Sequence, residues 1–141
     1  RNLLGRYCEL MDAGAFEAVG DLFAHGALAA GDEDPFVVGA DAVAAFYRAG
    51  TRLHPHSPRT KHLVTNLVFA EAADRGATVV RSSYLVLQAT DDLALAPIIS
   101  GRYRDEFSQV DGTWCFTLRR FFVDQVGDLS HHLADPSIAD R

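Results

Sequence analysis

The sequence is poor in cysteine, with only Cys8 and Cys115 among its 141 residues. They lie far apart, and neither belongs to a Cys-x-x-Cys pair, so the usual signal of a redox or zinc-binding cysteine pair is missing. Both have apolar neighbours, which favours buried free thiols. A disulfide between them stays an alternative.

Long apolar runs and an excess of positive charge are also missing. The longest apolar run, near residues 93–99, contains Pro97 and is far shorter than the ~18 residues of a membrane span. Thirteen Lys and Arg face nineteen Asp and Glu, for a formal net charge of −6, whereas nucleic-acid-binding domains are usually basic. We therefore expect no membrane and no nucleic-acid partner. No signal peptide is visible, and we expect a cytoplasmic location.

Several catalytic motifs are absent as well. The chain has no glycine-rich phosphate loop, no nucleophile elbow and no His-Glu-x-x-His motif. The pairs His54/His56 and His131/His132 lack the third matched ligand that a zinc site needs. We therefore predict neither a metal nor a cofactor.

What is present has the composition of a soluble globular protein, with 48% hydrophobic and 23% charged residues. The length predicts one domain over residues 1–141. In the first fifty residues, apolar side chains recur at three- and four-residue spacing, which predicts helices near 3–11, 15–24 and 39–50. Residues 25–36 indicate a short strand followed by a loop.

The second half changes to strand patterns over 60–71, 77–89, 97–109 and 113–125. They are separated by the turn sequences ADRG, TDD and VDG, of which Asp111-Gly112 is the strongest hairpin signal. Four hairpin-linked strands predict an antiparallel meander. From about residue 127 the chain is polar, which predicts either a frayed tail or an arm packed on a neighbouring subunit.

Together these patterns predict an α+β fold, with three N-terminal helices packed on a strongly curved antiparallel sheet. Such a sheet, closed on one side by helices, forms a cone-shaped barrel whose interior can hold a ligand.

His62 is the first candidate for chemistry in that interior. Strict alternation along the strand puts His62, Val64, Asn66 and Val68 on one face. Two polar groups among apolar ones are typical of a pocket wall. A core histidine bonded to the backbone is the alternative interpretation.

Asp12 and Tyr7 are the candidates in the helical half. Asp12 precedes the second helix, so it is either the N-cap of that helix or a carboxylate that accepts a hydrogen bond from an imidazole and stabilises the imidazolium. Tyr7 lies on the apolar face of the first helix, where it either packs or donates a proton to a ligand oxygen.

The last strand contains two adjacent arginines, Arg119 and Arg120. They must face opposite sides of the sheet, so one points at an apolar surface and needs a carboxylate nearby. That carboxylate belongs either to a buried ion pair or to a ligand. We also expect a set of mostly apolar side chains to line the pocket: Phe46, Val64, Asn66, Tyr84 and Phe121.

The sequence resembles the SnoaL-like branch of the nuclear-transport-factor-2-like superfamily over roughly residues 2–126. The segments that carry this resemblance are RYCELMDAGAFEAVGDLFA, VVGADAVAAFY, TKHLVTNLVF and DGTWCFTLRRFFVD. The resemblance implies a cone of helices against a curved sheet. It also implies a homodimer or homotrimer, and enzymes such as scytalone dehydratase, hexachlorocyclohexane dehydrochlorinase and bile-acid 7α-dehydratase.

The dehydratase-like members use an Asp–His dyad, and the resemblance places these residues at Asp12 and His62. The bile-acid enzyme has a tyrosine five residues before its aspartate, as Tyr7 is here, and Arg119 corresponds to the arginine that follows the last-strand tryptophan. The chain departs from this pattern on the next strand. There it has Ser82 and Ser83 where these relatives carry a second histidine or acid.

The hypothesis is a cofactor-independent lyase, with dehydratase-like elimination, or an isomerase that acts on a small hydrophobic, cyclic substrate. His62 is the predicted base, Asp12 its partner, Tyr7 the proton donor and Arg119 the anion-binding residue. Two alternatives stay open. One is a non-catalytic small-molecule binding module, and the other is an accessory, beta-type subunit of a ring-hydroxylating dioxygenase.

Overall fold

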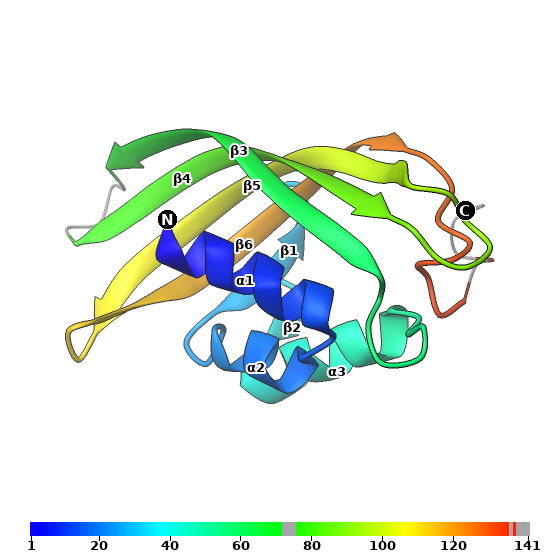
Figure 1. Ribbon diagram of the computed structural model, residues 1–141. Helices are drawn as coiled ribbons and strands as arrows, with labels where there is room; N and C mark the ends of the chain where they lie inside the picture. Colours follow the sequence, from blue (N-terminus) through cyan, green and yellow to red (C-terminus); the bar gives the residue numbers. More distant parts are fainter. Residues whose placement is uncertain (72–75, 136, 138–141) are drawn as a thin grey trace.

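Three helices lie against one face of a curved sheet in the computed structural model, which describes residues 1–71, 76–135 and 137 (Figure 1). The helices are α1 (Asn2–Ala13), α2 (Phe16–Asp21) and α3 (Ala40–Gly50). The strands are β1 (Ala27–Ala30), β2 (Val37–Val38), β3 (Thr60–Glu71), β4 (Ala77–Gln88), β5 (Ala96–Val110) and β6 (Thr113–Val126). The predicted α+β class, the three helices and the four long strands are confirmed, with strand ends within one residue of the prediction.

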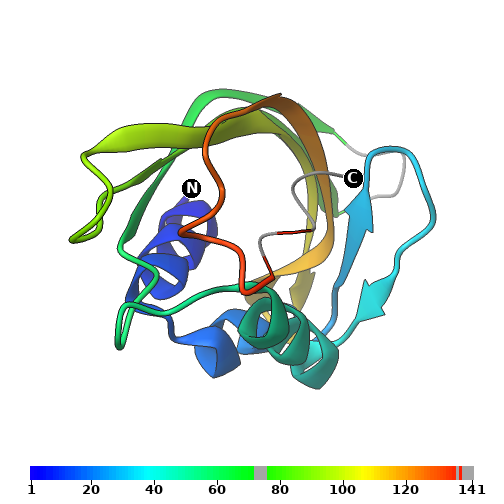
Figure 2. The ribbon, with the colours of Figure 1, turned by 90° about the vertical axis from the view of Figure 1, so that its right-hand side faces the viewer.

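The sheet has the order β2-β1-β6-β5-β4-β3. Strands β3 to β6 form the predicted antiparallel meander. The prediction was incomplete at the other edge, where β1 pairs in parallel with β6 and antiparallel with β2. The sheet is therefore mixed, and it curls around the helices without closing (Figure 2).

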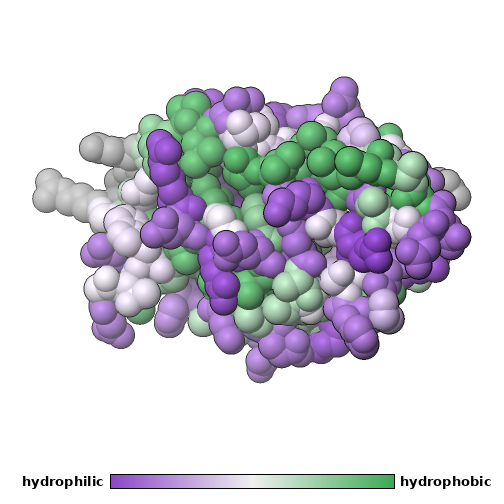
Figure 3. Space-filling view, viewed as in Figure 1, coloured by the Kyte–Doolittle hydropathy of each residue, from purple (hydrophilic) through white to green (hydrophobic). Residues whose placement is uncertain are grey.

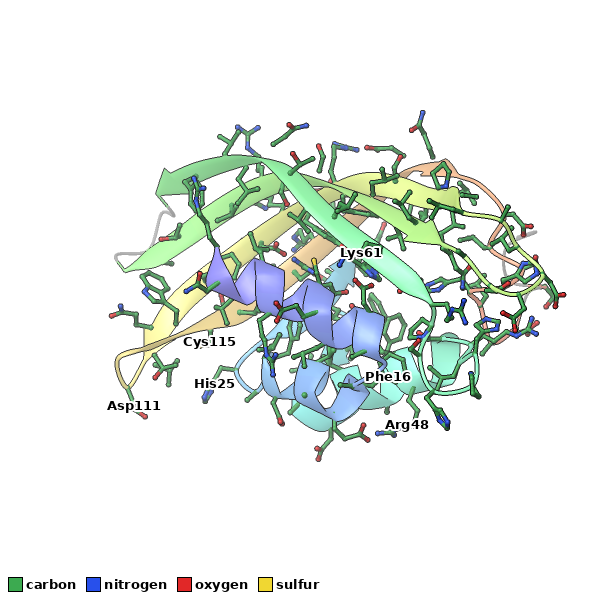
Figure 4. All side chains as sticks on the ribbon, in the orientation of Figure 1. Phe16, His25, Arg48, Lys61, Asp111 and Cys115 are labelled. Carbon is green, nitrogen blue, oxygen red and sulfur yellow. The ribbon has the colours of Figure 1, made fainter. Side chains whose placement is uncertain are left out.

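The β5–β6 hairpin turns at Asp111 and Gly112, with φ values of 51° and 78°. Positive φ at both positions is what a tight two-residue hairpin requires, and the pair Asp-Gly supplies it. Asp111 lies at the tip of this hairpin (Figure 4). The predicted ADRG turn lies, except for Gly76, outside the described residues.

A β-bulge interrupts the alternation of β3. The pairing with β4 shifts between Thr65 and Val68, and Asn66 has a φ of 56°. An extra residue in one strand exchanges the two faces beyond it. The prediction that Asn66 and Val68 share the face of His62 was therefore wrong: Val68 is 48% exposed, and Leu67 packs against the core instead.

The core lies between α1 and the concave face of the sheet. Leu4, Tyr7, Leu10 and Met11 are the buried residues of α1, as their helical spacing predicts. Phe23 and Phe116 stack in the same cluster with ring centroids 4.6 Å apart. Cys8 and Cys115 are both free and partly buried, in agreement with the thiol interpretation.

The chain after β6 neither frays nor projects away. It turns back across the open end of the curled sheet (Figure 2), where Thr51 forms a β-bridge with Leu133. The prediction of a frayed tail was therefore wrong over residues 128–135, whereas packing on a neighbouring subunit stays a prediction. The reason is that backbone groups at the end of α3 give the tail hydrogen-bond partners within its own chain.

Apolar side chains also reach the surface. Figure 3 shows them gathered along the sheet side of the molecule, and on β3 the exposed large apolar residues are Leu63, Val68 and Phe69. The homodimer or homotrimer that the resemblance implies stays a prediction. No helix in the described part of the chain is long and apolar enough to cross a membrane.

Gly101 offers a test of the close packing at the centre of the sheet. A Cβ at this position would overlap the Phe122 carbonyl and come within 2.6 Å of the Tyr84 hydroxyl. We expect Gly101→Ala to lower the free energy of unfolding by about 1–3 kcal/mol, because strands β4 and β6 must move apart. Urea denaturation measures this change.

Gly5→Ala is the matched control, since no atom lies within 4 Å of its added Cβ. Alanine in a helix interior should raise stability by about 1 kcal/mol. Equal stabilities for the two variants would contradict the packing around Gly101.

Candidate active site

Asp12 lies in the last turn of α1, which Gly14 ends in a left-handed conformation with a φ of 70°. The N-cap of α2 is Ala15, without a side-chain capping bond. The interpretation of Asp12 as a helix N-cap was therefore wrong. Asp12 is still part of α1 and lies three residues before Ala15, which is too early in the chain to cap α2.

The Asp12 carboxylate binds the beginning of β3. It accepts hydrogen bonds from the Thr60 hydroxyl at 2.9 Å and from the His62 backbone N–H at 3.0 and 3.1 Å. His62 Nδ1 lies 2.6 Å from Asp12 Oδ1. Thr60 and His62 point the same way because they are two residues apart on a strand, so one carboxylate can bind both.

These contacts set the charge state of Asp12. Burial by itself would raise the pKa of this carboxyl, but the hydrogen bonds from His62 and Thr60 outweigh burial and hold the pKa below its usual value. The His62 side chain is only 7% exposed and that of Asp12 16%. Asp12 is therefore an ionised carboxylate at neutral pH, held against an imidazole with little access to water.

Tyr7 lies beside this pair and is itself bonded to a second tyrosine. Its ring meets the His62 ring edge-on, with centroids 6.4 Å apart. Its hydroxyl lies 2.9 Å from the Tyr47 hydroxyl of α3. Burial raises the pKa of both phenols, so both stay protonated at neutral pH and can donate hydrogen bonds.

Arg119 is fully buried and forms an ion pair with Asp105 of β5. Its Nε and Nη2 donate to the two Asp105 carboxylate oxygens, both at 2.8 Å. The guanidinium also lies over the rings of Tyr103 and Tyr7, 3.7 and 4.2 Å from their centroids, where cation–π attraction stabilises its charge. The carboxylate that the sequence required is thus inside the protein, and an anion-binding role for Arg119 stays a prediction.

The two members of this pair respond differently to burial. Burial opposes the charge of Arg119, but Asp105 outweighs it and holds the arginine pKa well above its usual value. Burial raises the pKa of Asp105, while Arg119 acts in the opposite direction. We take both as charged at neutral pH, because two parallel charge-assisted hydrogen bonds of 2.8 Å are the geometry of an ion pair.

Three of the five predicted pocket residues converge in one apolar cluster. Tyr84 belongs to a buried cluster with Tyr103, Val86 and Ile98, and Val64 and Phe121 pack against that cluster. Burial raises the pKa of Tyr84 to about 12. The other two lie elsewhere: Asn66 is exposed in the β3 bulge, and Phe46 is 38% exposed on α3.

Two cavities lie near the ends of the sheet, and Asp12 and His62 line neither. The larger, of about 500 Å³, lies beside the first residues of α1 and is lined by Arg1, Asn2, Leu3, Phe69, Thr78, Val80, Phe107 and Trp114. The smaller, of about 330 Å³, is lined by residues of the 52–59 and 90–92 loops and by His131. The size of the larger cavity favours it as a site for ligand binding. The polar groups that converge around His62 favour that region as the site of catalysis, and we choose it as the candidate active site.

Sequence reasoning missed three polar residues of this region: Thr60, Tyr47 and Asp105. Tyr47 follows the buried Val43 by four residues, so helical spacing could have placed it inward. Asp105 follows Tyr103 by two on β5 and could have been found as the carboxylate that a buried arginine needs. No local pattern distinguishes Thr60 from other strand threonines.

No group of three or more His, Cys, Asp or Glu side chains in residues 1–71, 76–135 and 137 is arranged to hold a metal ion. What the site offers instead is a carboxylate–imidazole pair, two protonated phenols and a paired guanidinium. These groups can transfer protons and stabilise developing negative charge.

The Asp12 contacts predict how its titration responds to His62. His62→Gln should raise the pKa of Asp12, because the bond to Nδ1 and the imidazole charge are lost. Since the folded-state pKa is depressed, ionised Asp12 stabilises the fold above its unfolded pKa, and this contribution is lost as the pH falls through the folded value.

Carboxyl ¹³C NMR in the wild type and in His62→Gln measures this shift. Asp124 is the matched control, because its pKa is lowered by Arg102 rather than by a histidine, so its titration should not move. An Asp12 carboxyl that titrates at the usual value in both proteins would contradict the prediction.

Comparison with known proteins identifies the family and relatives of the same fold. The SnoaL-like domain family matches residues 1–120, and no curated protein gives a significant match. A protein of unknown function from Mycobacterium tuberculosis is similar in structure, with a TM-score of 0.71 and 24% identity over 99% of this chain and 79% of that one.

Two proteins from Novosphingobium aromaticivorans share the fold at lower identity. One is a proposed scytalone dehydratase, with a TM-score of 0.68 and 20% identity over 90% of this chain and 83% of that one. The other is the beta subunit of a proposed aromatic-ring-hydroxylating dioxygenase, with a TM-score of 0.67 and 18% identity over 89% and 87%. Because the family match covers most of the chain, this protein belongs to the SnoaL-like domain family.

Proposed function

We propose that the protein is a cofactor-independent lyase or isomerase acting on a small hydrophobic, cyclic substrate, with elimination of water as the first reaction. The observation that carries this proposal is the 2.6 Å contact between His62 Nδ1 and the Asp12 carboxylate. A carboxylate in this position orients the imidazole and stabilises the imidazolium that forms when the ring takes a proton.

His62 Nε2 is the basic atom in this reaction. Nδ1 is bound to Asp12, and Nε2 makes no hydrogen bond within the described residues. Nε2 takes a proton from a substrate carbon, and the electrons of that C–H bond form a C=C bond. The neighbouring C–O bond breaks, and its oxygen takes the proton of the Tyr7 hydroxyl and leaves as water. The proton held by His62 then replaces the one that Tyr7 gave up.

The buried phenols and Arg119 stabilise the negative charge that develops on the departing oxygen. The Tyr7 hydroxyl can donate to that oxygen while it accepts a hydrogen bond from Tyr47. Arg119 Nη1 is buried and has no hydrogen-bond partner within the described residues, so it is available to an oxygen that becomes negative. The likeness to a proposed scytalone dehydratase agrees with dehydration, which we extend to this chain as part of the proposal.

Substitution of the pair tests this function. On a substrate found by screening hydroxylated bicyclic ketones, we expect Asp12→Asn and His62→Gln each to lower kcat/KM about 100- to 10,000-fold, the range of general acid–base catalysis. Asp124→Asn and His25→Gln are the controls, because Asp124 is bound only to Arg102 and His25 is exposed. Unchanged turnover in both Asp12→Asn and His62→Gln would contradict the proposal.

A second candidate is a non-catalytic binding module, which the apolar cavity of about 500 Å³ favours. This candidate predicts tight binding without turnover and little effect of His62→Gln on affinity. The third candidate is an accessory subunit of an oxygenase, because this chain has the fold of the beta subunit described above. This candidate predicts co-purification with a large catalytic partner.

Fluorescence of Trp114 can distinguish a ligand bound near His62 from one bound in the larger cavity. It is the single tryptophan of the chain, it lines the larger cavity, and it lies at the opposite end of the sheet from His62. A ligand in the proposed active site should leave Trp114 emission unchanged and shift the His62 ring signals in NMR. A change in emission with unmoved His62 signals would instead assign the ligand to the larger cavity.

A further inference from the structure

The segment Asp128–Asp135 is fixed across the open end of the sheet on its helical side. The Arg52 N–H donates to the His132 carbonyl at 2.8 Å, and the Ala134 N–H donates to the Gly50 carbonyl at 3.0 Å. Thr51 and Leu133 form a β-bridge between these two bonds. The backbone from His132 to Ala134 is thus held against the end of α3.

The same segment is also fixed to the sheet. The buried Gln88 side chain of β4 donates to the His131 carbonyl at 3.0 Å and to the Pro58 carbonyl at 2.9 Å. Leu129 packs against the cluster that contains Tyr84 and Tyr103. With anchors on both sides, the segment covers the end of the interior where β3 begins (Figure 2).

His132 is the residue of this segment that lacks a partner. Its ring Nδ1 is buried and has no hydrogen-bond partner within the described residues. Burial, helped by the charges of His62 and His54, lowers its pKa to about 4. The ring is therefore neutral at physiological pH. The segment reaches the His62 end of β3, because Gln88, which binds the neighbouring His131 carbonyl, pairs with Thr60 on β3.

The charged and titratable groups that adjoin His132 come from three places. They are His62 on β3, His54 and Arg52 in the loop after α3, and Asp128 with His131 in the segment itself. His54 and His131 have their own contacts, since His54 Nε2 lies 2.6 Å from the His131 carbonyl and His131 Nδ1 lies 3.1 Å from the Ser130 hydroxyl. Within residues 1–71, 76–135 and 137, no protein group satisfies His132 Nδ1.

We propose that His132 is a second histidine of the active site and binds a neutral oxygen of the substrate, a ketone or a hydroxyl on an apolar ring. A neutral imidazole can donate to a ketone or accept from a hydroxyl, depending on its tautomer, and it offers no charge that would select a carboxylate. An unpartnered buried nitrogen is unfavourable, so a ligand that satisfies it gains affinity. This inference rests on the proposed function, and it assigns to the C-terminal segment the second polar residue that Ser82 and Ser83 do not supply.

The test uses 1-tetralone, a bicyclic aromatic ketone, added to the whole chain labelled with ¹⁵N in its histidine rings. We expect the ring signals of His62 and His132 to shift along one saturation curve and those of His131 to stay in place. Shifts of His62 without His132 would overturn this inference and leave the proposed function standing. Unmoved signals from both rings would count against both.

Substitutions give the second measurement. His132→Gln should weaken 1-tetralone binding about threefold to tenfold, the value of one net hydrogen bond. It should leave binding of tetralin, which has the same rings without the oxygen, unchanged. His131→Gln is the matched control, because this neighbouring side chain bonds within its own segment. Equal losses for both ligands, or a loss with His131→Gln, would show a structural role for His132 instead.

Discussion

The arrangement of the site depends on one carboxylate. Asp12, at the end of α1, accepts hydrogen bonds from the Thr60 hydroxyl, the His62 backbone and the His62 ring, and so joins the helical layer to the first strand of the meander. An acidic group near a helix C-terminus is electrostatically unfavourable, and no basic residue in the last turn of α1 offsets it. The donors of β3 stabilise it instead, so the position of His62 and the ionisation of Asp12 depend on each other.

A second constraint holds the centre of the cone together. The Arg119–Asp105 pair is buried among aromatic rings, where an unpaired guanidinium would be strongly destabilising. Tyr7 contacts this pair on one side and the His62 ring on another. The ion pair thus supports the ring that packs beside the candidate base, and its unpartnered Nη1 gives it a part in the proposed reaction as well.

The C-terminal segment gives the site its enclosure. Residues after β6 are bonded to the end of α3 and to Gln88, and they lie across the open end of the curled sheet (Figure 2). Neither His62 nor Asp12 lines the cavities of about 500 and 330 Å³. Exclusion of water by such a cover strengthens the electrostatic interactions of the Asp12–His62 pair.

The sequence by itself determined the class of fold, the helical and strand segments, the β5–β6 turn and the nomination of Asp12, His62, Tyr7 and Arg119. These follow from periodicity, from turn chemistry at Asp111-Gly112 and from a family resemblance, all of which are local or comparative signals. Tertiary structure decided the rest. The bulge at Asn66 exchanged the faces of β3, and Asp105 paired with Arg119. The Tyr47 hydroxyl came to lie beside the Tyr7 hydroxyl, and Gln88 bound the C-terminal segment at the His131 carbonyl. Most of these are contacts between residues far apart in the sequence, and the bulge adds one residue to a strand. The spacing of residues along the chain predicts neither.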